Sequence, residues 1–154
     1  MDYSDMHKTV NGKVVAGHGV ASGRAGDPRF PDGTLGLQWP YFEELGLDLD
    51  GIFRGTVNVS VKPLTPRPIN AMHTFRKVKW HPDCPAEDFS FFAIQIRVGV
   101  SDFKDGYIYW PHPETKPEHF QDPHVVEILA PRLEGVEVGM SAQLSYDAEC
   151  LAFE

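Results

Sequence analysis

An all-β fold with little helix is predicted by two features of the sequence. Short runs alternate between apolar and other residues, most clearly over 89–100, where Phe92, Ile94, Ile96 and Val98 occupy every second position. Thirteen prolines and fourteen glycines divide these runs. A period of two is typical of strands with one buried face, and many short strands divided by turn residues favour a barrel or a sandwich.

The expected elements follow in chain order. A short strand over 13–16 leads into a long loop over 17–40 that is rich in Gly, Pro and Asp, and one or two helical turns over 41–45 end at Gly46. Further strands are expected over residues 56–62, 74–80, 89–100, 106–110, 125–129 and 140–146. The dipeptide Asp105-Gly106 predicts the turn of a hairpin between the third and fourth of these.

The remaining segments are expected to be connections. Residues 63–70 contain three prolines, and residues 111–123 form a second irregular loop. Residues 1–11 are expected to be a flexible lead, and residues 12–154 a single domain. A chain of 154 residues is long enough for one domain with its own core.

Composition restricts the partners. The formal net charge is −8, which argues against a general electrostatic attraction to nucleic acid. No apolar run reaches the roughly 18 residues that a membrane-spanning helix requires.

Cys84 and Cys150 are the two cysteines and match no zinc-binding spacing. A cytoplasmic protein with free thiols is therefore the expectation, although a disulfide between the two remains an alternative.

Thr56 and Asn58 form the first candidate site. They stand two residues apart in the alternating segment 55–62, so a strand would place both side chains on one face. A hydroxyl and a carboxamide oxygen side by side suit Mg²⁺, which often keeps its other positions for phosphates and water. The alternative is an ordinary edge strand with its polar residues facing water.

Four segments in the same order resemble the archaeal CTP-dependent riboflavin kinases. They are a strand entering a Gly-x-Gly loop over 12–19 (GKVVAGHG), a short helix over 41–46 (YFEELG), the segment 55–59 (GTVNV), and the segment 126–131 (VEILAP). The resemblance implies a six-stranded cradle-loop-type β-barrel. It also implies transfer of the γ-phosphate of CTP to riboflavin, which gives FMN.

The resemblance also implies roles for particular residues. Thr56 and Asn58 would hold Mg²⁺, and Thr115 and Glu127 would contact the flavin. The nucleotide would be contacted by residues of the first loop and by one residue after Pro131, namely Gly17, His18, Gly19, Gly23, Arg24 and Arg132. Backbone amides of a glycine-rich loop can approach phosphates closely because no side chain intervenes.

A second interpretation is a barrel that binds a flavin or a nucleotide without catalysis. Extra residues over 17–33 and a short segment after Pro131 depart from the kinase pattern and favour it. A third is a barrel that acts through protein contacts. His112, His119 and His124 lie close together in sequence, but their spacing matches no zinc signature, so surface histidines are favoured over a metal site.

Overall fold

The computed structural model describes residues 7–16, 34–112 and 122–154, and these residues form a mostly β structure. The elements are β1 (His7–Val15), α1 (Thr34–Glu44), β2 (Val57–Ser60), β3 (Pro66–Pro68), β4 (His73–Val78), β5 (Glu87–Val98), β6 (Lys104–Pro111), β7 (Val125–Leu129), β8 (Ser141–Asp147) and β9 (Leu151–Phe153). The prediction of an all-β fold with little helix is confirmed, since α1 is the single helix among the described residues.

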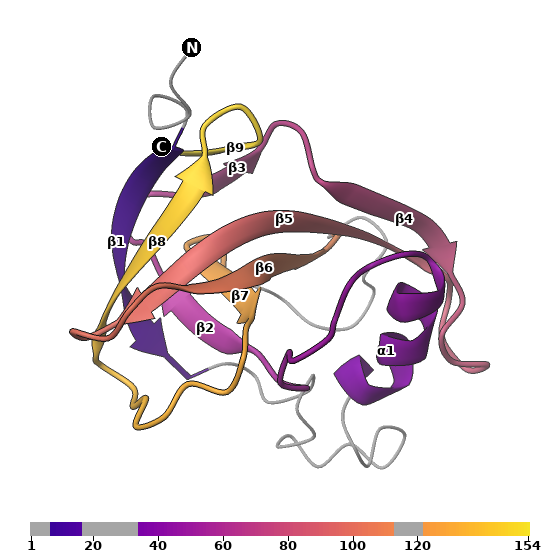
Figure 1. Ribbon diagram of the computed structural model, residues 1–154. Coiled ribbons are helices and arrows are strands. Elements are labelled where there is room, and N and C mark those ends of the chain that lie inside the picture. The colour runs from indigo at the N-terminus through magenta and orange to yellow at the C-terminus, as the bar shows by residue number, and fades with distance from the viewer. Residues whose placement is uncertain (1–6, 17–33, 113–121) are drawn as a thin grey trace.

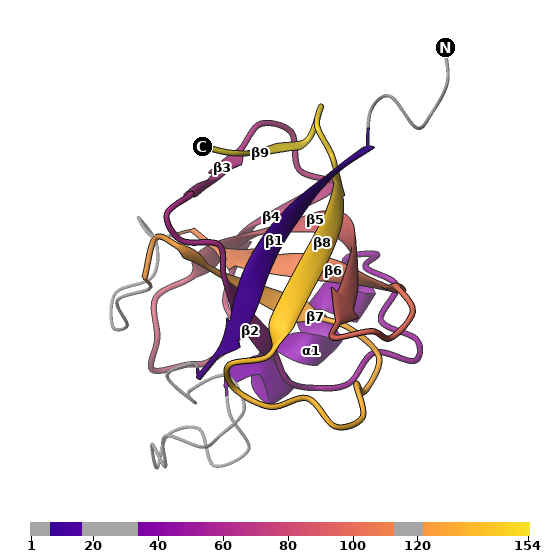
Figure 2. The ribbon, with the colours of Figure 1, turned by 90° about the vertical axis from the view of Figure 1, so that its left-hand side faces the viewer.

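Six of the strands form a closed ring. The sheet order is β4-β5-β6-β7-β2-β1-β8, and a further pairing of β8 with β5 closes the ring β5-β6-β7-β2-β1-β8. Every pairing in this sheet is antiparallel. β4 lies outside the ring, beside the first half of β5, and β3 and β9 form a separate pair (Figure 1). Figure 2 shows β1 and β8 side by side on the side of the ring away from α1.

Two apolar clusters lie on opposite faces of the sheet. The inner cluster fills the ring with residues from all six of its strands, among them Val59, Ile96, Ile108, Ile128 and Leu144, each with 0% exposure. The outer cluster packs α1 against β4, β5, β6 and β7, and it includes Leu35, Phe42, Phe89, Phe91 and Tyr109. Adjacent residues of one strand therefore contribute to different clusters, as the alternation of strand side chains requires.

Helix α1 begins well before the predicted start at residue 41 and contains Pro40. Proline removes a helical hydrogen bond, which is why the sequence predicts a later start. Burial of Trp39 and Phe42, on either side of it, compensates for this loss. The helix ends at Glu44, and the predicted stop residue Gly46 follows it with a φ of 106°. The amides of Gly46 and Leu47 donate to the carbonyls of Glu43 and Phe42, which is a Schellman cap.

The β5–β6 hairpin is confirmed, but its predicted turn at Asp105-Gly106 is wrong. β6 already begins at Lys104, and Gly106 pairs with Ile94 inside the ladder. The chain reverses over residues 99–103, with Gly99 at φ 64°. Gly106 is required for a different reason, because a Cβ there would lie 2.3 Å from the carbonyl oxygen of Leu129.

The N-terminal segment and the connection over 63–70 also differ from the predictions. β1 starts at His7, so residues 7–11 belong to the sheet and not to a flexible lead, and their partners lie on β8. The connection over 63–70 contains β3, which pairs with β9, a strand that the sequence analysis did not identify. The two prolines of β3 stand at its ends, as edge strands permit. Both cysteines, Cys84 and Cys150, are free thiols as expected.

Candidate functional site

Asn58 and Glu127 lie opposite each other on neighbouring strands. β2 and β7 pair with Asn58 in register with Glu127, and Glu127 is in turn in register with Tyr109 of β6. Directly opposite residues of an antiparallel pair share a face, with Cβ atoms about 4.5–5.5 Å apart. The pairing thus brings a predicted metal ligand and a predicted flavin ligand together from positions far apart in the sequence.

These side chains point out of the ring. Val59 and Val126, the sequence neighbours of Asn58 and Glu127, belong to the inner cluster. Tyr109 belongs to the outer cluster, beneath α1. Asn58 and Glu127 are both half-buried, so the site lies at the margin of the outer cluster, where water still has access.

Thr56 stands immediately before β2, two positions from Asn58, and is half-buried. The chain reaches it through a tight turn in which the Gly55 amide donates to the Phe53 carbonyl over 2.9 Å. The Phe53 amide donates to the carbonyl of Ala130 over 3.0 Å, which fixes this turn beside the end of β7. Thr56, Asn58 and Glu127 therefore belong to one corner of the sheet.

Two arginines flank this corner. The Cζ atom of Arg132 lies 5.8 Å from the centre of the Phe53 ring, and that of Arg54 lies 5.4 Å from the centre of the Trp39 ring. Both arginines are exposed. Cation–π contacts of this kind orient a guanidinium while its N–H groups stay available to an anion. Arg132 was predicted as a nucleotide ligand, and the structure places it next to the turn that leads to Thr56.

Behind the site, a buried hydrogen bond joins α1 to the sheet. The Tyr109 hydroxyl donates to Gln38 Oε1 over 2.5 Å, and Gln38 is only 2% exposed. Burial raises the pKa of Tyr109 well above its usual value, and the negative charges of Glu127 and Glu87 raise it further, while the bond to Gln38 opposes them. The Tyr109 hydroxyl therefore remains a neutral donor, and the nearby negative charge of Glu127 favours this protonated form.

Glu87 is a second buried polar residue that contacts the outer cluster, through Trp80. Its Oε2 atom accepts a 2.8 Å hydrogen bond from Nε1 of Trp80, and its side chain is 6% exposed. This buried carboxylate therefore has a structural partner within the described residues.

The chemistry of the corner is that of hard oxygen ligands beside positive charge. Thr56 and Asn58 offer neutral oxygens, and Glu127 offers one carboxylate, a set that fits Mg²⁺ with phosphates and water completing its coordination. No cluster of three or more His, Cys, Asp or Glu side chains suited to a metal occurs in residues 7–16, 34–112 and 122–154. Among these described residues, Thr56, Asn58 and Glu127 are too few to form an all-protein cage.

Six predicted site residues lie outside the described residues. They are Gly17, His18, Gly19, Gly23 and Arg24 of the first loop, and Thr115. Their predicted contacts with the nucleotide and the flavin remain predictions.

The two described histidines of the predicted loop bind protein groups. His112 Nε2 lies 2.7 Å from Ser90 Oγ, and His124 Nδ1 lies 2.8 Å from the carbonyl oxygen of Leu64. His119 lies outside the described residues. The sequence predicted surface histidines, whereas both of these side chains are half-buried and contact protein groups.

Sequence reasoning missed Arg54 and Gln38 as parts of this corner. Arg54 lies two residues before Thr56, so its closeness was a usable signal. Gln38 was assigned to a loop, and only the packing of α1 brings its carboxamide to Tyr109.

The corner and the ring define a small all-β protein with a polar site on the outer face of its sheet. No family model matches the chain, and the search of curated proteins found no match. Within the described residues, α1 is too short to cross a membrane.

Proposed function

We propose that the protein is a riboflavin-kinase-like phosphotransferase that moves the γ-phosphate of a nucleotide, CTP in the family it resembles, to riboflavin and gives FMN. The six-stranded ring would then be a cradle-loop-type β-barrel. The observation that supports this proposal most is the register of Asn58 with Glu127. It puts the predicted metal ligand beside the predicted flavin ligand, as transfer of a phosphate between two bound molecules requires.

In this proposal each residue positions a reactant. The riboflavin 5′-hydroxyl would donate a hydrogen bond to the Glu127 carboxylate, and its oxygen would attack the γ-phosphorus as the bond to the bridging β-phosphate oxygen breaks. The nucleoside diphosphate leaves with that oxygen, and the hydroxyl proton passes to Glu127. Thr56 and Asn58 would hold Mg²⁺, which supplies charge neutralisation between the phosphates when bound. Such transfers depend on positioning and electrostatics more than on a strong base.

The exposed arginines support the nucleotide side of the proposal. Arg54 and Arg132 lie on the two segments that the Phe53–Ala130 hydrogen bond joins, next to Thr56. Guanidinium groups bind phosphate oxygens through paired N–H donors. Gly17, His18, Gly19, Gly23 and Arg24 would contribute further contacts with the phosphates.

The test is FMN formation from riboflavin with Mg²⁺ and CTP, ATP, GTP or UTP in turn. Asn58→Ala is expected to abolish turnover and to leave riboflavin binding intact, because the flavin would contact Thr115 and Glu127 instead. Asn58→Asp is expected to impair turnover as well, since an added negative charge repels the nucleotide.

Asn11→Ala is the matched control, because Asn11 is an exposed strand asparagine on β1, remote from the corner. If the wild-type protein forms no FMN with any of the four nucleotides, the kinase proposal fails. Riboflavin or nucleotide binding detected by calorimetry in that case would support a non-catalytic ligand-binding barrel.

A further inference from the structure

A pocket of about 310 Å³ opens on the inner face of the sheet, near the end of β6. Its apolar lining includes Phe92 and Trp110, whose rings meet edge to face with their centres 6.2 Å apart. Pro68 at the end of β3, and Ile69 and Ala71 from the segment between β3 and β4, complete it. Ile69 is 57% exposed at its rim. The pocket is thus a mostly apolar concavity with an aromatic wall.

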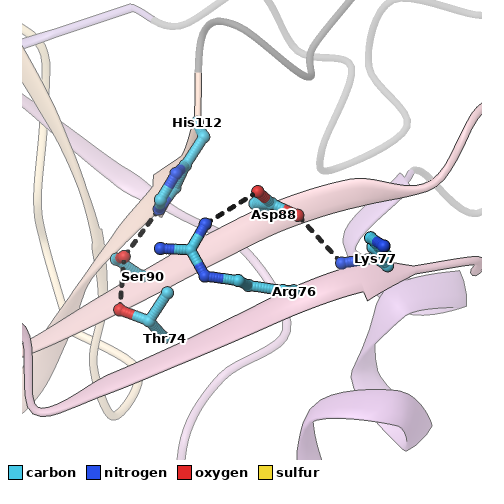
Figure 3. A network of polar contacts seen from close by, with 6 residues as sticks. All are labelled: Thr74, Arg76, Lys77, Asp88, Ser90 and His112. Atoms are coloured by element: carbon cyan, nitrogen blue, oxygen red, sulfur yellow. Dashed lines mark hydrogen bonds and ion pairs between the residues drawn. The ribbon is translucent and has the colours of Figure 1, made fainter.

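A chain of three polar side chains forms the remaining wall (Figure 3). Thr74 Oγ1 lies 3.0 Å from Ser90 Oγ, which lies 2.7 Å from Nε2 of His112. Ser90 is only 6% exposed, whereas Thr74 is exposed and His112 half-buried. Both hydroxyl hydrogens can rotate, so the chain can present a donor or an acceptor to a molecule in the pocket.

This pocket is separate from the corner built on Asn58 and Glu127. Trp110 directly follows Tyr109 in β6, so their side chains point to opposite faces of the sheet. Tyr109 lies in the outer cluster, and Trp110 packs against the inner one. A molecule in the pocket would therefore not contact Asn58 or Glu127 through the sheet.

An ion pair lies next to the pocket. Beyond Thr74 and Ser90, the Arg76 guanidinium pairs with the Asp88 carboxylate at 3.2 Å (Figure 3). Asp88 Oδ1 also accepts a 2.8 Å hydrogen bond from the Lys77 amide. Among the described residues that line the pocket itself there is no Asp, Glu, Lys or Arg, so these residues favour an uncharged ligand.

We propose that the pocket is a second small-molecule site, which binds an uncharged planar heteroaromatic ring. Its ring faces would pack on Trp110, Phe92 and Ile69, and its hydrogen-bonding edge would meet the Thr74–Ser90–His112 chain. Apolar walls with a few convergent polar groups are typical of ligand sites, and this volume lies at the small end of their range of roughly 300–1,000 Å³. One ring or two fused rings fit that size.

The experiment titrates the full chain with nicotinamide, adenine and indole, without Mg²⁺ or nucleotide. These probes carry no phosphate, so binding here does not depend on the proposed kinase site. The readout is the NMR shift of the Trp110 indole N–H and the Ala71 amide. At least one probe is expected to give saturable shifts at both positions with a Kd of about 1 mM or tighter.

Three variants locate the site. Ala71→Phe fills the pocket and is expected to abolish the saturable shifts. Thr74→Val keeps the shape of an exposed side chain but removes its hydroxyl. This variant is expected to raise the Kd of the tightest-binding probe about tenfold, and Ser90→Ala is expected to do the same. Ser145→Ala, on β8 and paired with Gln95, is the matched control and is expected to have no effect.

The proposal is overturned if none of the three probes gives saturable shifts at Trp110 and Ala71 in the wild-type protein. It is also overturned if Ala71→Phe, shown to be folded by its spectrum, binds the probe as the wild type does. Thr74→Val tests the polar edge independently of any folding defect in Ser90→Ala.

Discussion

The hydroxyl of Tyr109 donates a 2.5 Å hydrogen bond to Oε1 of Gln38, and this bond joins β6 to α1 beneath the candidate site. Both side chains are buried, at 4% and 2% exposure. A buried acceptor that loses its donor has no water to replace it. The position of α1, and with it Trp39 under Arg54, therefore depends on this contact.

Tyr109→Phe is expected to destabilise the protein by about 1–3 kcal/mol, because it leaves Gln38 Oε1 without this donor in the core. Urea unfolding followed by fluorescence measures the effect. Tyr107→Phe is the matched control, since the Tyr107 hydroxyl donates to the Asp48 carbonyl at an exposed position where water can substitute. Equal losses from the two variants would contradict this explanation.

Alkaline pH is expected to destabilise the fold. Burial raises the pKa values of Tyr107, Tyr109 and Tyr146 above 10.0, and burial followed by the charge of Asp147 raises that of Cys150 above 9.0. A neutral acid with a raised folded-state pKa contributes its stability below the unfolded-state pKa and loses it as pH rises toward the folded-state pKa. The free energy of unfolding should thus fall above about pH 9–10.

Most of the stability lost at alkaline pH is expected to come from Tyr109. Its pKa is raised the furthest, first by burial and then by the charges of Glu127 and Glu87. Denaturant titrations from neutral pH to pH about 11, past the ordinary tyrosine pKa, measure it. Tyr109→Phe should have a flatter pH profile than the wild type. If the free energy of unfolding of Tyr109→Phe fell with pH as steeply as that of the wild type, other titrating groups would be responsible for the alkaline destabilisation.

Gly106→Ala is expected to destabilise the protein by about 1–3 kcal/mol, because the new methyl group would overlap the Leu129 carbonyl and push β7 away from β6. Gly55→Ala is the comparison, since the atoms nearest to its new methyl group belong to the Phe53 ring, at 2.8 Å, and Phe53 is 52% exposed and not backbone that is fixed in the sheet. Thermal unfolding of both variants checks the difference. If Gly106→Ala destabilised the protein less than Gly55→Ala does, β7 would be able to move away from β6 at little energetic cost.

Asp88→Asn is expected to destabilise the bulge between β4 and β5 by about 1–2 kcal/mol, since it weakens a charged hydrogen bond and an ion pair. Asp88 accepts the amide of Lys77, which has a φ of 55°. Lys77→Gly is expected to be neutral or to stabilise the fold, because glycine tolerates that conformation. Arg76→Gly, a neighbouring glycine substitution without a positive φ, should destabilise it in the same unfolding assay.

Arg54→Ala and Arg132→Ala are expected to raise the KM for the nucleotide several-fold, with the larger loss at low salt, if the proposed kinase activity is present. Steady-state kinetics at two ionic strengths measure this. Arg67→Ala is the matched control, because Arg67 on β3 is exposed and forms an ion pair with Glu154, the residue after β9. If the KM changed equally in all three variants, we would conclude that Arg54 and Arg132 do not contact the nucleotide.

Local pattern in the sequence determined the β character of this protein and most of its strands. Residues 125–129 were predicted as a strand with the bounds that β7 has, and the alternation over 89–100 marks β5 within two residues at each end. The helix stop at Gly46 was also readable, because a left-handed cap requires glycine. Each of these features depends on neighbours within a few residues.

Only the tertiary structure decided which strands pair and in what register. Nothing in residues 55–62 or 125–129 specifies that Asn58 lies opposite Glu127, because a shift of one residue would move either side chain to the other face. The start of α1 before Pro40 and the pairing of β3 with β9 likewise follow from burial against distant residues. Gly106 appeared to be a turn residue because the sequence does not show the Leu129 carbonyl that it must accommodate.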